Sequence, residues 1–194
     1  MKKTSATLAS GLAVGLSLCL AGALAASGAM AQNSGMTGMT KSAAPAKAVD
    51  KASKSFIKDA IEGDIAEVDV GKLAQEKGQS QGVKDFGAML VKDHSEHKAK
   101  AEEVASEIGV KPPTGSGMMA KATYAKLKVL SGASFDSAFA KAMVKDHQQD
   151  IKEFQKESGK SNPAGKLAQE TLPVLHKHLE AAQQLAAQQK QSSR

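Results

Sequence analysis

Two stretches of the chain repeat a short pattern that ends in an aspartate followed by a histidine. Residues 86–94 read Phe-Gly-Ala-Met-Leu-Val-Lys-Asp-His, and residues 139–147 read Phe-Ala-Lys-Ala-Met-Val-Lys-Asp-His. In both copies the histidine falls within an otherwise apolar helical pattern, where an uncompensated polar ring costs free energy. Each ring therefore needs a partner, and a neutral imidazole is a common ligand of transition metals.

Further histidines and carboxylates fall on the apolar faces of the predicted helices when residues are spaced by about 100°. Three pairs are separated by three residues, namely Asp64/Glu67, His94/His97 and His147/Asp150. That separation places both side chains on one face of a helix, as when bundle helices offer two ligands to a metal. The main candidate ligands are Glu67, His94, His147 and His178, and the secondary candidates are Asp64, His97 and Asp150.

Two interpretations of these polar residues remain open. Imidazole and carboxylate groups together suit iron, manganese, zinc or copper, with Asp93 and Asp146 orienting the histidine rings from outside. Alternatively, each histidine bonds a carboxylate or carbonyl across the bundle, and the polar network fixes the register of the helices without a metal. Neither interpretation specifies a substrate or a reaction.

The elements that must position these residues are helices. Ser80 is a predicted N-cap, Gly78 and Gly132 are predicted helix stops, and Asn162-Pro163 is typical of a helix start. The predicted helices cover residues 51–77, 80–108, 120–131, 134–158 and 162–189. Four long helices and one short helix predict an all-α, antiparallel four-helix bundle over residues 51–190, with the extra helix in the middle connection.

The first 31 residues have the features of a secretory signal peptide. A basic start is followed by an uncharged run, and Ala29-Met30-Ala31 fits a cleavage site after Ala31. The alternatives are a retained anchor and lipidation at Cys19, but Leu18, directly before the cysteine, is bulky where a lipoprotein signal needs a small residue. Residues 32–50 are predicted to be a disordered linker. We therefore expect a periplasmic protein without thiols, associated with the envelope if it attaches to a surface.

The distribution of charged residues argues against a nucleic-acid partner. The formal net charge is +6, but lysines are interspersed with acids, Arg194 is the sole arginine, and the chain has one tyrosine and no tryptophan. No phosphate-binding glycine loop or nucleophile elbow is present. The remaining expected partners are a metal ion or another envelope protein.

Several of these segments resemble one bacterial family. Residues 67–74 (Glu-Val-Asp-Val-Gly-Lys-Leu-Ala), 89–94 (Met-Leu-Val-Lys-Asp-His) and 172–179 (Leu-Pro-Val-Leu-His-Lys-His-Leu) are similar to motifs of the "domain of unknown function 4142" family. The resemblance covers about residues 53–186. It implies an exported, ferritin-like bundle, often labelled an outer-membrane protein, with an inward polar set of Glu67, His94, His147 and His178. A metal-binding protein with a redox or stress role is one expected function, and a non-catalytic structural or interaction protein of the envelope is the other.

Overall fold

The computed structural model describes residues 49–192 of the chain, and in that part it contains helices and no strand. The helices are α1 (Lys51–Lys77), α2 (Gln81–Glu107), α3 (Met118–Lys128), α4 (Gly132–Ser158) and α5 (Pro163–Ser192). The predicted all-α bundle is confirmed, whereas a likeness to ferritins stays a prediction. The predicted signal peptide and all but the last two residues of the predicted linker lie outside the described residues.

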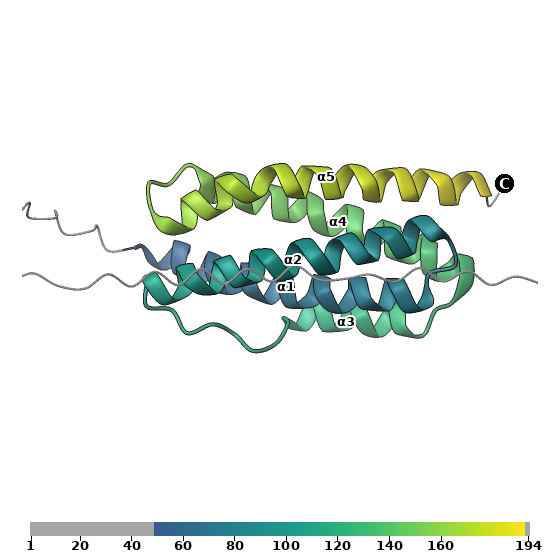
Figure 1. The fold of residues 1–194 in the computed structure, drawn as a ribbon, viewed down its shortest axis with the longest axis horizontal. Coiled ribbons are helices and arrows are strands. Elements are labelled where there is room, and N and C mark those ends of the chain that lie inside the picture. Colours follow the sequence, from purple (N-terminus) through teal and green to yellow (C-terminus); the bar gives the residue numbers. More distant parts are fainter. Residues whose placement is uncertain (1–48, 193–194) are drawn as a thin grey trace, which may run out of the picture. The chain divides into compact units, whose positions relative to one another are not determined.

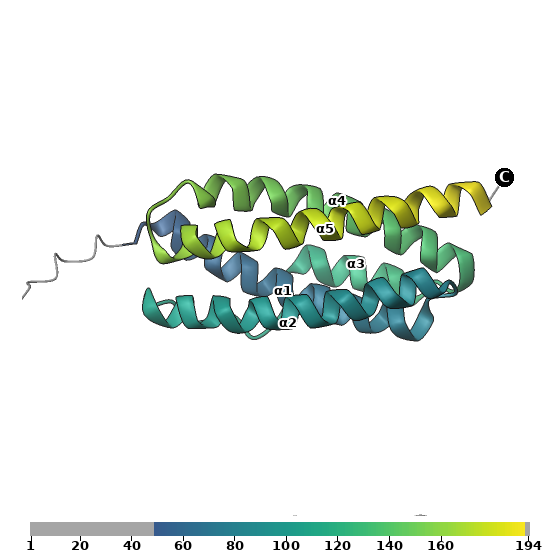
Figure 2. The ribbon, with the colours of Figure 1, turned by 45° about the horizontal axis from the view of Figure 1, so that its top comes forward.

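The long helices form two antiparallel hairpins, as Figure 1 shows. α1 packs along α2, and α4 packs along α5; the short α3 lies beside α1 in the connection between the hairpins (Figures 1 and 2). None of the helices in residues 49–192 combines the length and apolarity needed to cross a membrane.

The helix starts follow the capping pattern of the sequence. The side chain of Ser80 accepts a hydrogen bond from the backbone N–H of Val83 (3.4 Å), and that of Asn162 accepts one from Gly165 (2.8 Å). The buried Asp136 carboxylate of α4 accepts the backbone N–H groups of Gln79 (2.9 Å) and Ser80 (2.8 Å). Asp136 therefore ties the turn between α1 and α2 to the second hairpin.

Two predicted glycine roles are wrong. Gly132 does not end the short helix, because α3 already ends at Lys128 and Gly132 is the first residue of α4, with a φ of 56°. Gly78 follows α1 with a φ of −56°, so it is not a left-handed stop. A glycine is needed there for space, since a Cβ would lie 2.6 Å from the carbonyl oxygen of Ala74.

A polar layer crosses the middle of the bundle between two apolar clusters. The first cluster is built around Phe56, Ile61, Ala101, Ile151, Phe154 and Leu175. The second is built around Val70, Leu90, Phe139, Met143, Ala182 and Leu185. Each long helix has at least one buried polar residue between members of the two clusters, and these residues are Asp64, Glu67, His94, His147 and His178.

α1 and α2 approach each other closely at a pair of glycines near this layer. A Cβ on Gly87 would lie 2.6 Å from the Gly71 carbonyl oxygen, and a Cβ on Gly71 would lie 2.7 Å from the Gly87 carbonyl oxygen. Because backbone atoms on both sides block the added carbon, a methyl group at either position forces the helices apart. The glycine pair thus sets the separation of the two helices that carry Glu67 and His94.

Replacing Gly87 by alanine is expected to lower the free energy of unfolding by about 1–3 kcal/mol, because this contact cannot accept an extra carbon. Gly63→Ala on α1 is the matched control, since its Cβ would meet nothing within 4 Å. The control should be neutral or gain up to about 1 kcal/mol from better helix propensity. Urea unfolding followed by circular dichroism measures both, and equal midpoints for the two variants would contradict the close contact.

Candidate metal centre

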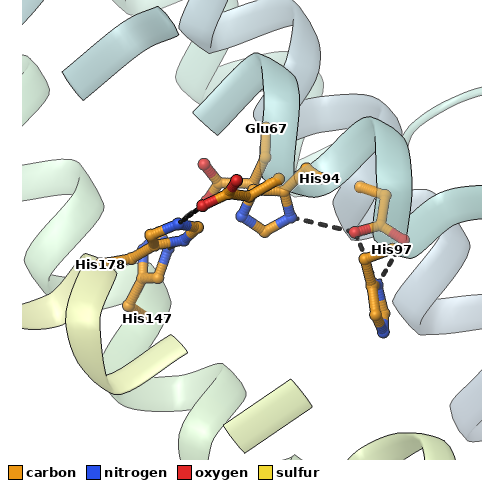
Figure 3. Close-up of polar contacts among 7 residues, drawn as sticks. Glu67, His94, His97, His147 and His178 are labelled. Carbon is orange, nitrogen blue, oxygen red and sulfur yellow. Dashed lines mark hydrogen bonds and ion pairs between the residues drawn. The ribbon is translucent and has the colours of Figure 1, made fainter. Parts of the chain in front are cut away.

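Three histidines from three helices meet in the polar layer. His94 comes from α2, His147 from α4 and His178 from α5, and one nitrogen of each ring lies within 4.8 Å of the others. The ring centroids are separated by 5.2–5.9 Å. His147 and His178 have no exposed surface and His94 is 6% exposed. Figure 3 shows His94 facing the other two rings across the layer.

The hydrogen bonds on the far side of each ring determine which nitrogen carries the proton. His94 Nδ1 lies 3.0 Å from Asp64 Oδ1, and His178 Nε2 lies 3.0 Å from Asp93 Oδ2. His147 Nδ1 lies 3.0 Å from the carbonyl oxygen of Met143. Carbonyl and ionised carboxylate oxygens only accept, so each of these ring nitrogens donates its N–H. In the neutral rings the opposite nitrogens, His94 Nε2, His147 Nε2 and His178 Nδ1, therefore carry lone pairs.

Two of these lone pairs face each other directly. His147 Nε2 and His178 Nδ1 are 3.3 Å apart, and neither has a proton to donate when both rings are neutral. His94 Nε2 is buried and finds no hydrogen-bond partner among the described residues. A tetrahedral ion with metal–nitrogen distances of about 2.0–2.1 Å separates its ligands by about 3.3–3.4 Å. The His147–His178 pair already has that separation.

The environment keeps His147 and His178 neutral. Burial, followed by the neighbouring His94 and His178, lowers the pKa of His147 from 6.5 to about 3, although the hydrogen bond to Met143 opposes the shift. Burial also lowers the pKa of His178, although its hydrogen bond to Asp93 opposes the shift. Both rings are therefore unprotonated near neutral pH, as metal ligands must be.

Asp64 and His97, two secondary candidates, lie beside this cluster rather than in it. The Asp64 carboxylate accepts hydrogen bonds from two rings: its Oδ1 is 3.0 Å from His94 Nδ1, and its Oδ2 is 2.8 Å from His97 Nδ1 (Figure 3). His97 points away from the other three rings. Asp64 thus orients His94, in the way that carboxylates orient metal-bound histidines.

Glu67 and Asp150 belong to a separate acidic group. Oxygens of Glu67, Asp146 and Asp150 lie within 4.8 Å of one another, and Glu67 Oε1 is 3.8 Å from His147 Nδ1. Burial, followed by the charge of Asp146, raises the pKa of Glu67 well above its ordinary range. Burial and Asp146 likewise raise the pKa of Asp150. The predicted set of one glutamate and three histidines is therefore divided over the two sides of His147.

Asp93 and Met143 each accept a hydrogen bond from a ring of the three-histidine cluster, but only Asp93 was predicted from the sequence. Asp93, expected to orient a ring, does so for His178, and this bond and Lys92 lower the pKa of Asp93 although burial opposes the shift. The Met143 carbonyl was not predicted. Its position four residues before His147 on the helix is the available signal, since a buried histidine can donate to that carbonyl.

A cavity of about 40 Å³ adjoins the cluster. His94, His178 and His97 line it, and the exposed side chains of Asp59 and Glu153 place its mouth at the surface. The volume admits a few water molecules and is far smaller than a pocket for a sugar or nucleotide. The cavity therefore reaches His94 and His178, whereas His147 is not among the residues that line it.

The Asp64→Asn variant tests the orienting role of this carboxylate. The amide keeps the shape but lacks the negative charge, and its NH₂ group replaces one of the two accepting oxygens, so the histidine N–H groups are held more weakly and His94 is less firmly oriented. We expect metal affinity to fall by about 10–100-fold with the fold retained. Asp69→Asn on the same helix, outside the cluster, is the control. Competition with a coloured zinc chelator measures both, and wild-type affinity in Asp64→Asn would exclude the role.

The fold and the geometry together define a helical-bundle protein with a buried cluster of three histidines. The chain belongs to the domain of unknown function 4142 family, whose model matches residues 38–185. Its fold is similar to a solved structure described as a DUF305 fragment from Deinococcus radiodurans, with 13% identity and a TM-score of 0.65. That likeness covers 72% of this chain and 97% of the other and concerns the fold alone. No curated protein matches the chain.

Proposed function

We propose that the protein binds one transition-metal ion through His94, His147 and His178. The observation that carries this proposal is the 3.3 Å contact between two ring nitrogens whose protons are both committed elsewhere. A metal-free polar network needs a donor opposite each acceptor, and this contact has none when the rings are neutral. A cation among the three lone pairs satisfies all of them at once.

The donor set favours zinc or copper over the other candidate metals. Three neutral imidazoles supply only nitrogen, which suits zinc, copper and iron, whereas manganese prefers oxygen ligands; nitrogen sites bind zinc and copper more tightly than iron(II). Three protein ligands leave a further coordination position, and the adjoining cavity, which His94 and His178 line, has room for a water molecule. A metal with an open position can bind or activate a small molecule.

Metal titration of the purified, chelator-treated protein tests the proposal. We expect one equivalent of Zn²⁺ or Cu²⁺ per chain by calorimetry, and a higher melting temperature in the presence of the ion. Elemental analysis of protein purified without chelators provides the second measurement. Absence of binding for zinc, copper, iron and manganese, with an unchanged melting temperature, would leave the metal-free structural role in the envelope as the explanation.

We also propose that the bundle works outside the cytoplasm. Residues 1–31 supply the support, with their basic start, uncharged run and small residues before Gln32. Cell fractionation and N-terminal sequencing of the product test this proposal. A periplasmic or envelope-associated product that begins at Gln32 is expected, and a cytoplasmic product that retains the N-terminus would refute it.

A further inference from the structure

The acidic group beside the histidines contains a buried carboxylate without a partner. Glu67 on α1 is 2% exposed, and both of its oxygens lack a hydrogen bond within residues 49–192. A buried ionised carboxylate is costly unless a positive charge or several donors compensate it. The nearest ring nitrogen, His147 Nδ1, is 3.8 Å away and is already bonded to the carbonyl oxygen of Met143. An ionised Glu67 therefore has no hydrogen-bond donor among the described residues, and a cation or a shared proton has to compensate its charge.

Two aspartates of α4 converge on Glu67. Asp146 and Asp150 are separated by one helical turn, and an oxygen of each lies within 4.8 Å of a Glu67 oxygen and of the other. Across the described part of the chain, no lysine or arginine forms an ion pair with any of the three carboxylates. Like charges gathered without a counter-charge repel one another, so the arrangement costs free energy unless a cation or a proton joins them.

We propose that Glu67, Asp146 and Asp150 hold a second divalent cation, coordinated by oxygen and located on the opposite side of His147 from the three-histidine centre. Carboxylate oxygens are the ligands that hard ions such as Mn²⁺, Mg²⁺ and Ca²⁺ prefer. Asp146 is exposed, so an ion can reach the site from solvent while Glu67 closes it from the core. The layer thus offers a nitrogen site and an oxygen site with different metal preferences.

A shared proton is the competing explanation. A protonated Glu67 could donate to Asp146, and the group would then need no cation. The two explanations differ in a measurable way, because carboxylates held together by a shared proton do not need to bind Mn²⁺, whereas a cation site does. This second site stands on the carboxylates alone and does not depend on whether the histidines bind zinc.

Electron paramagnetic resonance with Mn²⁺ tests the second site. Purified protein is first loaded with one equivalent of Zn²⁺ to occupy the histidines, without excess zinc that would compete for the carboxylates, and Mn²⁺ is then titrated while the signal of the free aqueous ion is followed. We expect one equivalent of bound Mn²⁺. The double variant Asp146→Asn/Asp150→Asn should bind Mn²⁺ about 100-fold more weakly, because the site loses two of its three charges. It should still bind zinc, and relief of the repulsion favours its folding.

Two further variants locate the bound Mn²⁺. Glu67→Gln should weaken Mn²⁺ binding, whereas Glu76→Gln, an exposed carboxylate on the same helix, should leave it unchanged. Wild-type protein that binds zinc but no Mn²⁺ overturns the second site and leaves the histidine centre standing. Mn²⁺ binding that survives the aspartate double variant but is lost in His178→Ala also overturns it, because the ion then occupies the histidines. Mn²⁺ binding without zinc or copper binding supports the acidic site and refutes the histidine centre.

Discussion

Replacing His178 by alanine should abolish the rise in melting temperature that Zn²⁺ gives the wild-type protein. With the ion at about 100 times its dissociation constant, binding adds about 2.7 kcal/mol to the free energy of unfolding. For a chain of this size that is about 5–10 °C. Removing one of three ligand nitrogens should lower the affinity by more than the roughly 10–100-fold typical of losing a group that only orients a ligand.

The chain contains a matched control for this experiment. His176 lies two residues before His178 on α5 and is exposed, whereas His178 is fully buried. His176→Ala should therefore keep the wild-type response to zinc. His178→Gln retains a polar side chain of similar size, which separates the loss of a ligand from the loss of packing. Equal thermal shifts in wild type, His176→Ala and His178→Ala would show that zinc binds elsewhere.

The difference between His176 and His178 also shows what the sequence can predict. Helical periodicity places His178 on the same face as Leu175, Leu179 and Ala182, and it places His176 outside that face. The same periodicity assigned Glu67, His94 and His147 to the interior, and all three are buried. The polar layer was therefore predictable, because burial follows from the side of the helix on which a residue lies.

The partners within the layer were not predictable to the same degree. Periodicity gives the face of a helix but not the direction of a ring, so it could not place Glu67 on the Nδ1 side of His147 and His178 on the Nε2 side. It also could not indicate that Asp64 accepts from two histidines at once. These details depend on rotamers and on the separation of the helices, which the Gly71–Gly87 contact sets and a single-helix pattern does not contain.

The polar layer lowers the stability of the metal-free fold, so the stability of the bundle depends on the ions and protons that the layer binds. The apolar clusters on both sides hold the helices together, while the layer between them contains lone pairs that face each other and an unpaired carboxylate. Ions that occupy the layer stabilise the native state by mass action, since the unfolded chain does not assemble the ligands. The metal-free protein should consequently be sensitive to conditions that change the charge of these groups.

A fall in pH should have the largest effect on the stability of the metal-free protein. Burial lowers the pKa of His147 from 6.5 to about 3, so between these pH values the unfolded chain binds a proton that the native state does not. Stability that is present above about pH 6.5 is then lost as the pH falls towards 3. The loss is about 1.4 kcal/mol per pH unit, or about 3 kcal/mol between pH 7 and pH 4. His178, whose pKa is also lowered, acts in the same direction.

Glu67 and Asp150 act in the opposite direction, so the effect of His147 must be measured as a difference. Their raised pKa values mean that the native state takes up protons before the unfolded chain does, which adds stability as the pH falls. The stability difference between pH 7 and pH 4 should be about 3 kcal/mol smaller in His147→Gln than in wild type, because the variant lacks the suppressed proton uptake. Urea unfolding in the presence of a chelator gives both values, with His176→Gln as the control. The same pH dependence in wild type and His147→Gln would mean that the His147 ring takes up its proton in the bundle as readily as in the unfolded chain, which would refute the lowered pKa of His147.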